Sequence, residues 1–337
     1  MEVLLLIIRF TIKARKIGVV HMYKIGVVNL DTSHPKAFSS YLNQGNRARY
    51  TAVYNDGFRG DDEVEGFMKA NHIQNRCHSM AEMARNVDIG FIHSCNWDKH
   101  LDQAQAFIDV GKPVFIDKPI VGNLKDCKRI EALVQEGAVV LGSSSLRYAD
   151  EVTSFMAQPV EERGEVVHVT ATVGVDEFNY AIHAVETIMG VLGDEARAQL
   201  VTYIGNSYKK EAPCESYFIQ FKNGTTAMYH VYLNGWQPST MTVITTKTTI
   251  CRTINAGMAY GAMLDQVCDF LDGKENLLAS IESLTESIKI MLAGRLSKQK
   301  KGLPILLCEL PLEDEGFDGG EFEAGYAAAA AKIYSTK

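Results

Sequence analysis

The stretch Lys24-Ile-Gly-Val-Val-Asn-Leu-Asp-Thr-Ser-His-Pro-Lys-Ala-Phe38 decides how this sequence folds. Its apolar first half predicts a short buried strand, and its second half leads into a helix over 37–42. A nucleotide-binding unit of this strand-to-helix kind normally carries three glycines at the junction. Here the three places hold Asn29, Asp31 and His34. The junction is therefore either a cofactor site built in another way or a site that has been lost.

Apolar strand-like runs alternate with helical segments as far as residue 141. Asn96 is a suitable N-cap for one of these helices, and Gly111 followed by Pro113 ends it. Short buried strands separated by helices are typical of a parallel, doubly wound sheet in the α/β class. The predicted strands are 25–28, 50–54, 87–93, 114–117 and 138–141, and the predicted helices are 37–42, 64–70, 97–110 and 124–136.

The pattern changes near Tyr148 or Ala149, where a second domain is expected to begin. Residues 165–175 alternate like a half-buried strand, and Asn223-Gly224 is a strong hairpin signal between two more strand-like runs. The remaining predicted elements are a β-rich run over 241–251 and helices over 262–271 and 284–296. We therefore expect one domain over 22–148 and a second domain, with antiparallel strands, over 149–312.

The two ends of the chain need separate treatment. Residues 1–21 form a leader in which KIGVV at 16–20 repeats at 24–28, so we interpret Met22 as the true start, with an extra edge strand as the alternative. A secretory signal is rejected because the basic residues follow the apolar stretch. The tail over 313–337 is acidic and glycine-rich and then alanine-rich, and we expect it to be mobile or packed across the first domain.

Composition narrows the classes of function. The formal charge of -7 gives no electrostatic reason to expect nucleic acid or an anionic membrane as a partner. No apolar run approaches the roughly 20 residues that a membrane-spanning helix requires. The seven cysteines show no C-x-x-C pair and no metal-like spacing, which predicts reduced thiols in a cytoplasmic protein without a metal site. They are Cys77, Cys95, Cys127, Cys214, Cys251, Cys268 and Cys308.

Ligands of an open parallel sheet bind beyond the carboxyl ends of its strands. Three polar segments follow predicted strands there, at 29–34, 94–100 and 117–120. In the third segment Pro119 disfavours helical geometry at Lys118, so that the amine can point into the crevice. A solvated loop lysine is an equally good interpretation of this segment alone.

A second candidate lies at the start of a predicted helix. Asn179, His183 and Glu186 are spaced four and three residues apart, so on a helix they share one face. A lone histidine on a helix is more often a core residue. The polar face formed by Asn179, His183 and Glu186, opposite Ile182 and Val185, favours a functional site instead.

The runs Ser94-Cys-Asn-Trp-Asp-Lys-His100 and Gly111-Lys-Pro-Val-Phe-Ile-Asp-Lys-Pro-Ile120, with Arg147 and His183-x-x-Glu186, resemble the Gfo/Idh/MocA (glucose–fructose oxidoreductase/inositol dehydrogenase) family. The resemblance covers about residues 22 to 310. It implies a Rossmann domain joined to an α+β domain with an open, mostly antiparallel sheet. It also implies NAD(P)-dependent oxidation or reduction of a sugar, cyclitol or related carbinol.

The resemblance also assigns roles to residues. Lys118 matches the active-site lysine, His183 the catalytic histidine, and Asn179 the place of the family aspartate. We then expect His183 to exchange the hydroxyl proton and Lys118 to stabilise the developing alkoxide. The expected cofactor-binding residues are Asn29, Asp31, Thr32, Ser33, His34, Asn55, Ser94, Asn96, His100, Asp117 and Lys118, and the expected substrate-binding residues are Lys118, Arg147, Tyr148, Asn179, His183 and Trp236.

Four departures from the family pattern put ordinary NAD chemistry in question. The glycine loop is replaced, and Asn179 can orient His183 but cannot stabilise its charged form. Asp117 stands for the glutamate of E-K-P, and Asn55, followed by Asp56, stands where an acidic residue would hold the ribose. An NAD(P)-dependent oxidoreductase is the preferred interpretation. A non-catalytic relative that senses a ligand or cofactor is the alternative.

Two structural expectations complete the interpretation. A carboxylate at Asp31 cannot face a pyrophosphate, so Asp31, Thr32 or Ser33 should turn inward and cap the helix, leaving His34 and Lys36 to face the phosphates. A metal at Asp31 and His34 would lack a third ligand. The second-domain sheet should be covered by helices on one face only, which predicts a homodimer or homotetramer through the other face.

Overall fold

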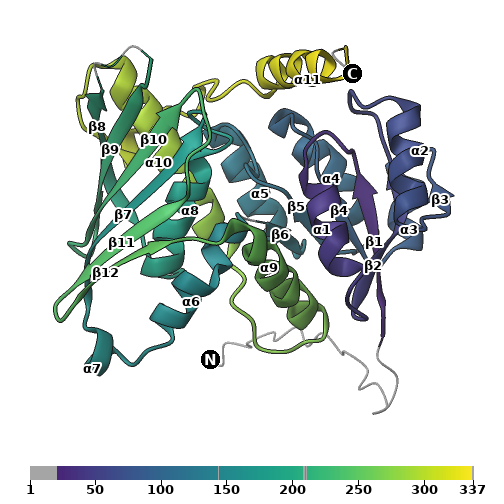
Figure 1. Ribbon diagram of the computed structural model, residues 1–337, viewed down its shortest axis with the longest axis horizontal. Helices are drawn as coiled ribbons and strands as arrows, with labels where there is room; N and C mark the ends of the chain where they lie inside the picture. The colour runs from purple at the N-terminus through teal and green to yellow at the C-terminus, as the bar shows by residue number, and fades with distance from the viewer. Residues whose placement is uncertain (1–20, 143, 208, 210, 336–337) are drawn as a thin grey trace, which may run out of the picture.

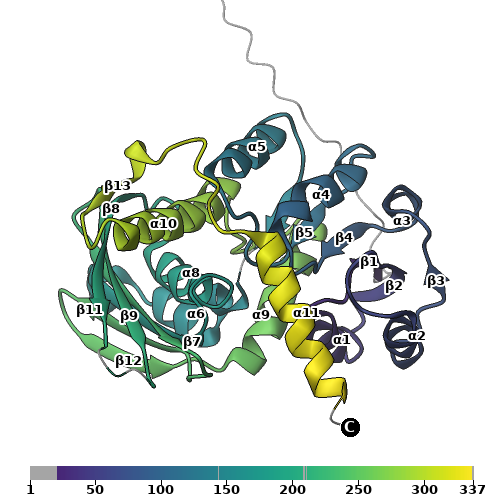
Figure 2. The same ribbon diagram turned by 90° about the horizontal axis from the view of Figure 1, so that it is seen from above.

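The computed structural model describes residues 21–142, 144–207, 209 and 211–335 (Figure 1). The expectations for the leader over 1–20 lie outside these described residues. Two sheets stand side by side and a long helix crosses above them (Figures 1 and 2).

The first sheet is parallel and has six strands in the order β3-β2-β1-β4-β5-β6, the order of a dinucleotide-binding Rossmann fold. Strands β4, β5 and β6 are buried along their whole length, as the apolar runs predicted. The strands are β1 (Tyr23–Val28), β2 (Ala48–Tyr54), β3 (Asn75–Arg76), β4 (Ile89–Ile92), β5 (Val114–Ile116) and β6 (Val140–Gly142). The helices between them are α1 (His34–Leu42), α2 (Asp61–Ala70), α3 (Met80–Asn86), η1 (Trp97–Lys99), α4 (His100–Ile108) and α5 (Leu124–Gln135).

Neighbouring strands β1, β4 and β5 end at the same edge of this sheet. The three polar segments at 29–34, 94–100 and 117–120 follow these strands, so the fold brings them together. The doubly wound prediction is confirmed.

The second sheet has seven strands in the order β12-β11-β7-β10-β9-β8-β13. It is mostly antiparallel, with one parallel pair between β7 and β10. Asn223 and Gly224 form the predicted hairpin turn, where Gly224 has a φ of 88° that favours glycine. The strands are β7 (Val166–Val175), β8 (Ala198–Asn206), β9 (Cys214–Phe221), β10 (Thr226–Leu233), β11 (Thr240–Thr245), β12 (Thr249–Thr253) and β13 (Ile305–Leu306).

The observed elements differ from the predicted ones in several places. The β-rich run over 241–251 is a hairpin of β11 and β12 rather than one strand, because the polar residues 246–248 turn the chain. Strand β8 was not predicted, although it pairs with β9 along most of its length.

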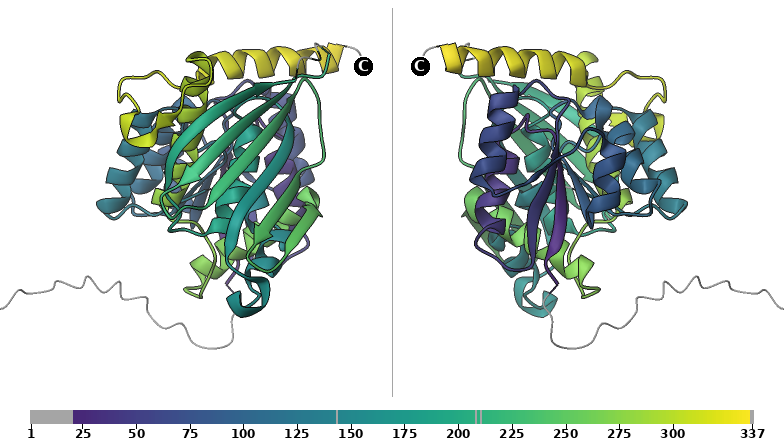
Figure 3. Two further views of the ribbon diagram at one scale, coloured as in Figure 1. Left: turned by 90° about the vertical axis from the view of Figure 1, so that its left-hand side faces the viewer. Right: turned by 90° about the vertical axis from the view of Figure 1, so that its right-hand side faces the viewer.

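Helices cover only the inner face of the second sheet, where α8 (Ala181–Leu192) and α10 (Ile281–Gln299) pack (Figure 3). Helix α9 (Ala256–Leu271) crosses back to α1, and its Met263, Leu264 and Val267 join the core of the first domain. The remaining short elements are η2 (Ser145–Tyr148), α6 (Asp150–Met156), α7 (Val160–Arg163) and η3 (Leu307–Glu309).

The C-terminal tail forms helix α11 (Gly319–Ser335), which lies across the first domain above its strand ends (Figure 2). The indole Nε1 of Trp97 donates to the carbonyl of Phe317 at 2.6 Å, and the Phe317 ring stacks on Phe178 of the second domain at 3.9 Å. Of the two alternatives for the tail, packing across the first domain is therefore the one observed.

Candidate active site

Lys118 lies at the carboxyl end of β5 and reaches the second domain. Its Nζ donates to the carbonyl oxygen of Asn179 at 2.8 Å and to the Asn179 side-chain oxygen at 2.9 Å. The amine also lies 5.2 Å from the centre of the Tyr180 ring, and the Lys118–Pro119 peptide bond is cis. Burial lowers the pKa of Lys118, while Asp117 and Asp176 oppose that shift. Lys118 is therefore an ordered, desolvated amine and not a solvated loop residue.

His183 lies in the first turns of α8 and is also buried. Its Nδ1 is 2.5 Å from the hydroxyl oxygen of Ser144, which follows β6. Burial, and then the nearby Lys118 ammonium, hold the pKa of His183 well below its usual value. The imidazole is therefore neutral at neutral pH, the form that can accept a proton.

Asn179 does not share a helix face with His183, because it lies in the turn that precedes α8. Its oxygens hold Lys118, and its side-chain nitrogen is 3.4 Å from Asp176. The expectation that Asn179 orients His183 is therefore wrong: the described partner of the imidazole is Ser144. Sequence reasoning missed Ser144, although its place directly after β6 at the same sheet edge was a usable signal.

Three expected substrate-binding residues lie in other surroundings. Buried Arg147 pairs its Nε with Glu186 at 2.8 Å and its Nη1 with the Ser283 hydroxyl at 3.0 Å, which ties η2 to α8 and α10. The Tyr148 ring is buried in the core of the first domain, and its hydroxyl accepts from the backbone N–H of Ala279. Trp236 is 72% exposed in the β10–β11 connection. Their substrate contacts remain predictions.

Asp117 is the centre of a buried polar cluster beneath this site. Its Oδ2 lies 2.6 Å from Nδ1 of His34 and 3.1 Å from Nδ1 of His93, and its Oδ1 accepts from the backbone N–H of Lys118. The two histidines hold the pKa of Asp117 well below its usual value despite its burial. The His34 side chain is therefore turned inward, contrary to the expectation that it faces the phosphates.

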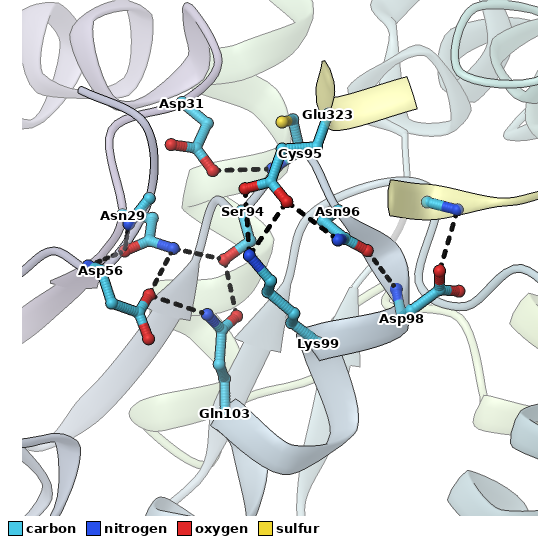
Figure 4. A network of polar contacts seen from close by, with 12 residues as sticks. Asn29, Asp31, Asp56, Ser94, Cys95, Asn96, Asp98, Lys99, Gln103 and Glu323 are labelled. Atoms are coloured by element: carbon cyan, nitrogen blue, oxygen red, sulfur yellow. Dashed lines mark hydrogen bonds and ion pairs between the residues drawn. The ribbon is translucent and has the colours of Figure 1, made fainter. Parts of the chain in front are cut away.

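The β1–α1 junction is filled by the protein's own side chains (Figure 4). Asn29 has a left-handed φ of 64° and is fully buried. Its side-chain oxygen accepts from the backbone N–H groups of Asp56 and Gly57, and its nitrogen donates to Asp56 and to the Ser94 hydroxyl. Asn29 thus fastens the loop after β2 to the loop after β4.

Asp31 also turns inward, but it does not cap α1. Its Oδ2 accepts from the backbone N–H of Cys95 at 3.1 Å, and its buried Oδ1 has no hydrogen-bond partner among the described residues. Burial raises the pKa of Asp31 to about 6, and the nearby Glu323 carboxylate adds to the rise. Ser33 makes no side-chain cap at the start of α1, but the Thr32 hydroxyl accepts from the backbone N–H of His34, the first residue of the helix, at 3.3 Å. Of the three residues predicted to cap the helix, Thr32 is therefore the one that bonds its first amide.

The other expected cofactor-binding residues divide into two groups. His100 lies between the carbonyl groups of Ile120 and Ser94 and therefore links the two loops. Asn96 caps η1 and donates to Glu323 of α11 at 3.0 Å. Thr32, Ser33 and Asn55 form the second group, at the other end of the junction. Thr32 and Ser33 line a small hollow of about 140 Å³ with Arg59 and Tyr326. Asn55 accepts from the backbone N–H of Leu30.

A larger cavity of about 870 Å³ opens between the two domains beneath α11. Asn179 and Asp176 line it, so it begins at the residue that holds Lys118. Charged residues of both signs line it, with Lys298 paired to Glu177, and Trp97 and Phe317 are among the aromatic rings in its wall. Charged groups beside aromatic faces suit a small polyhydroxylated molecule.

Ligand atoms of Asp31, Cys95 and Glu323 lie within 4.8 Å of one another, the one such group of three found among the described residues. Lys99 already neutralises Glu323, with its Nζ 2.9 and 3.0 Å from the two carboxylate oxygens. Burial and Asp31 also raise the pKa of the Cys95 thiol, which disfavours the thiolate that a metal needs. We therefore assign no metal to this group.

Comparison with known proteins supports the resemblance found in the sequence. Residues 23–144 match the Gfo/Idh/MocA oxidoreductase family, described as an NAD-binding Rossmann fold. The match spans the parallel-sheet domain. Within the described residues, no helix has the length and apolar character needed to cross a membrane.

One curated relative, named "Putative oxidoreductase YceM", comes from Salmonella typhimurium and is 26% identical over 161 residues. The match covers 45% of this chain and 52% of the relative, so the chain spans about half of that relative's length.

Solved structures share the fold of nearly the whole described chain. Scyllo-inositol dehydrogenase from Lactobacillus casei, solved with NAD(H) and scyllo-inositol, gives a TM-score of 0.71 at 15% identity. The match covers 86% of this chain and 100% of the other. GenD2 from gentamicin A biosynthesis, solved with NAD, gives a TM-score of 0.71 at 16% identity. That match covers 87% of this chain and 98% of the GenD2 chain. The Rossmann domain and the open, mostly antiparallel sheet are thus confirmed.

Proposed function

We propose that the protein is an NAD(P)-dependent oxidoreductase that acts on a CH–OH group, or the matching ketone, of a sugar, cyclitol or related polyol. One observation carries the proposal: Lys118 at the end of a Rossmann strand bonds Asn179 in the turn before α8, and His183 at the start of α8 bonds Ser144, which follows the neighbouring Rossmann strand. A proton acceptor beside a positive charge at this edge is suited to removing a hydroxyl proton.

Each residue has a defined part in the proposed reaction. The nicotinamide, when bound, supplies the hydride acceptor or donor. His183 accepts the proton of the substrate hydroxyl, with Ser144 fixing the plane of the ring. Lys118 donates a hydrogen bond to the same oxygen and stabilises the alkoxide, and Asn179 keeps the amine in place.

The first domain contains groups that fit a dinucleotide. At the start of α1 the Thr32 hydroxyl already accepts from the His34 N–H and Pro35 has no N–H, so the amide of Lys36 is the first that could bind an anion. Asn96 and Lys99 already hold an anion, the carboxylate of Glu323, which stands in for a phosphate oxygen. Asp31 opposes a pyrophosphate in its ionised form, so we expect weaker binding than at a glycine loop.

The substrate class rests on the cavity and on one related structure. Scyllo-inositol is the ligand of the Lactobacillus casei dehydrogenase, whose whole chain shares this fold. The cavity beside Asn179 offers both charged groups and aromatic walls for such a ring. A cyclitol or sugar of similar size is therefore the first substrate to try.

Turnover tests this proposal directly. Purified protein is mixed with each oxidised or reduced dinucleotide and a panel of inositols, sugars and their keto forms, and nicotinamide absorbance is followed. We expect at least one pair to react, and the reaction to disappear in Lys118→Ala. No reaction with any pair, together with binding of a panel member, would favour the ligand-sensing alternative.

We further propose that the protein forms a homodimer or homotetramer through the open face of the second sheet. Within the described residues, helices cover only the inner face (Figure 3). Phe218, Met228 and Tyr232 alternate with buried residues along β9 and β10 and are half-buried, so they lie on the other face. Such a surface is large for an isolated chain. We expect light scattering at micromolar concentration to give a multiple of the 37.3 kDa chain mass, and a charge at Phe218 to lower it. A monomeric mass for the unmodified protein would contradict this assembly.

A further inference from the structure

Helix α11 places a carboxylate on the first domain where a ligand would be held. Lys99 Nζ lies 3.0 and 2.9 Å from the two oxygens of Glu323, and Asn96 Nδ2 donates to one of them at 3.0 Å. Asn96 is the N-cap of η1 and Lys99 is its last residue, in the segment that follows β4. Figure 4 shows Glu323 reaching down from α11 into this polar network.

The same carboxylate lies directly above the β1–α1 junction. A carboxylate oxygen of Glu323 is within 4.8 Å of a ligand atom of Asp31 and of Cys95. One helical turn further along, Tyr326 closes the hollow that Thr32 and Ser33 line. Helix α11 therefore lies over both the phosphate end and the ribose end of the path that a dinucleotide takes in this fold.

Several contacts hold α11 in this position independently of Glu323. The backbone N–H of Gly319 donates to Asp98 at 2.9 Å, and the Trp97 indole donates to the Phe317 carbonyl. The Phe322 ring packs on Trp97 at 5.0 Å. These contacts attach the start of α11 to η1, so the start of the helix would act as the hinge. The charged contact of Glu323 follows them along the helix and holds it on the junction.

The charges at the junction oppose a second anion there. Asp31 and Glu323 already face each other, and Lys99 is the cation bonded to Glu323. A pyrophosphate placed here would meet the Asp31 carboxylate and would have to displace the Glu323 carboxylate from Lys99 and Asn96. The dinucleotide and the docked Glu323 would therefore compete for the same contacts.

We propose that Lys99 and Asn96 form a phosphate-binding point for the dinucleotide and that Glu323 is its internal occupant. Cofactor binding then requires α11 to lift, and docking of α11 closes the site. This inference rests on the proposed function, since it names the residues that hold the cofactor and the device that controls access to them.

Calorimetry with NAD(H) and NADP(H) on three full-length proteins tests the proposal. Glu323→Gln removes the competing charge and should bind the dinucleotide about tenfold more tightly than the unmodified protein. Glu321→Gln is the matched control: it makes the same change on the same helix at an exposed side chain and should leave affinity unchanged. Equal affinity in all three proteins would overturn the competition while leaving the oxidoreductase proposal standing. No binding in any of them would instead overturn the proposed function, and the inference with it.

Lys99→Met separates a phosphate contact from a role in docking alone. In the Glu323→Gln background it should weaken dinucleotide binding about tenfold and reduce the dependence on salt. A residue that only anchored α11 would leave affinity unchanged in that background.

Hydrogen exchange supplies a readout independent of catalysis. Amides of 319–331 should exchange faster when the dinucleotide is added to the unmodified protein, and faster in Glu323→Gln than in Glu321→Gln without any ligand. Unchanged protection of α11 at a saturating dinucleotide concentration would show that the helix does not lift.

Discussion

Two regions of one crevice differ in how their polar groups are used. At the β5–α8 side, Lys118 and His183 are buried and oriented, and a cavity of about 870 Å³ opens beside Asn179. At the β1–α1 side, Asn29 and Asp31 are bonded to neighbouring loops and α11 covers them. The comparison teaches that the groups for proton transfer and the cradle for the cofactor can change separately within one fold.

The largest effect should follow from changes at the β5–α8 side. Lys118→Ala and His183→Ala each remove a group that contacts the reacting oxygen in the proposed mechanism, and each should lower kcat by about 10²–10³. Steady-state kinetics on the substrate found by the turnover panel measures this. Lys125→Ala, an exposed lysine on α5, is the control and should leave kcat unchanged.

Folding of these two variants has to be verified, since both side chains are buried. Circular dichroism and thermal unfolding should show the native fold. Near-normal kcat in both folded variants would show that the β5–α8 side does not carry out the proton transfer assigned to it.

A smaller effect is expected at the β1–α1 side. Asp31→Asn removes the buried carboxylate and keeps an oxygen that can accept from the Cys95 N–H. Dinucleotide affinity at neutral pH should rise about tenfold, because one of the two like charges is gone. Calorimetry measures the gain, and an unchanged or lower affinity would show that Asp31 does not obstruct the phosphate.

The same variant should change how stability depends on pH. The pKa of Asp31 is about 6 in the folded protein and has a usual value of 3.8, so between these values the folded state binds the proton more tightly. The free energy of unfolding therefore falls as pH rises from about 4 to about 6. At pH 7 Asp31→Asn should raise the free energy of unfolding by up to about 3 kcal/mol, and Tm should rise with it. This gain in stability should vanish below about pH 4.

A further effect concerns how tightly the junction is packed. A Cβ added at Gly57 would lie 2.1 Å from Oδ1 of Asp31. Gly57→Ala should therefore destabilise the protein by about 1–3 kcal/mol. Combining it with Asp31→Ala should remove most of that cost, which a double-mutant cycle of urea unfolding measures. Simple additivity would mean that Asp31 does not fill this space.

The fold was predictable because its signals are local. Buried apolar runs separated by helices define the parallel sheet, and Asn223-Gly224 defines a hairpin whatever surrounds it. Strand β8 was missed because its residues carry no comparable turn or alternation signal, although pairing with β9 stabilises it.

The site was only partly predictable because its contacts join residues far apart in sequence. Lys118 and His183 could be named from their neighbours. The partner of His183, Ser144, and the partner of Asn96, Glu323, depend on how the two domains and the tail pack. The inward turn of Asp31 followed from charge alone, whereas its bond to Cys95 did not.

Calorimetric titration of the unmodified protein with NAD, NADH, NADP and NADPH tests the central claim that the altered junction still holds a dinucleotide. The account predicts binding of at least one of them with a Kd of about 0.1–1 mM, because Asp31 and Glu323 weaken a site that the fold otherwise provides. Undetectable binding of all four at millimolar concentration, in the unmodified protein and in Asp31→Asn, would contradict it.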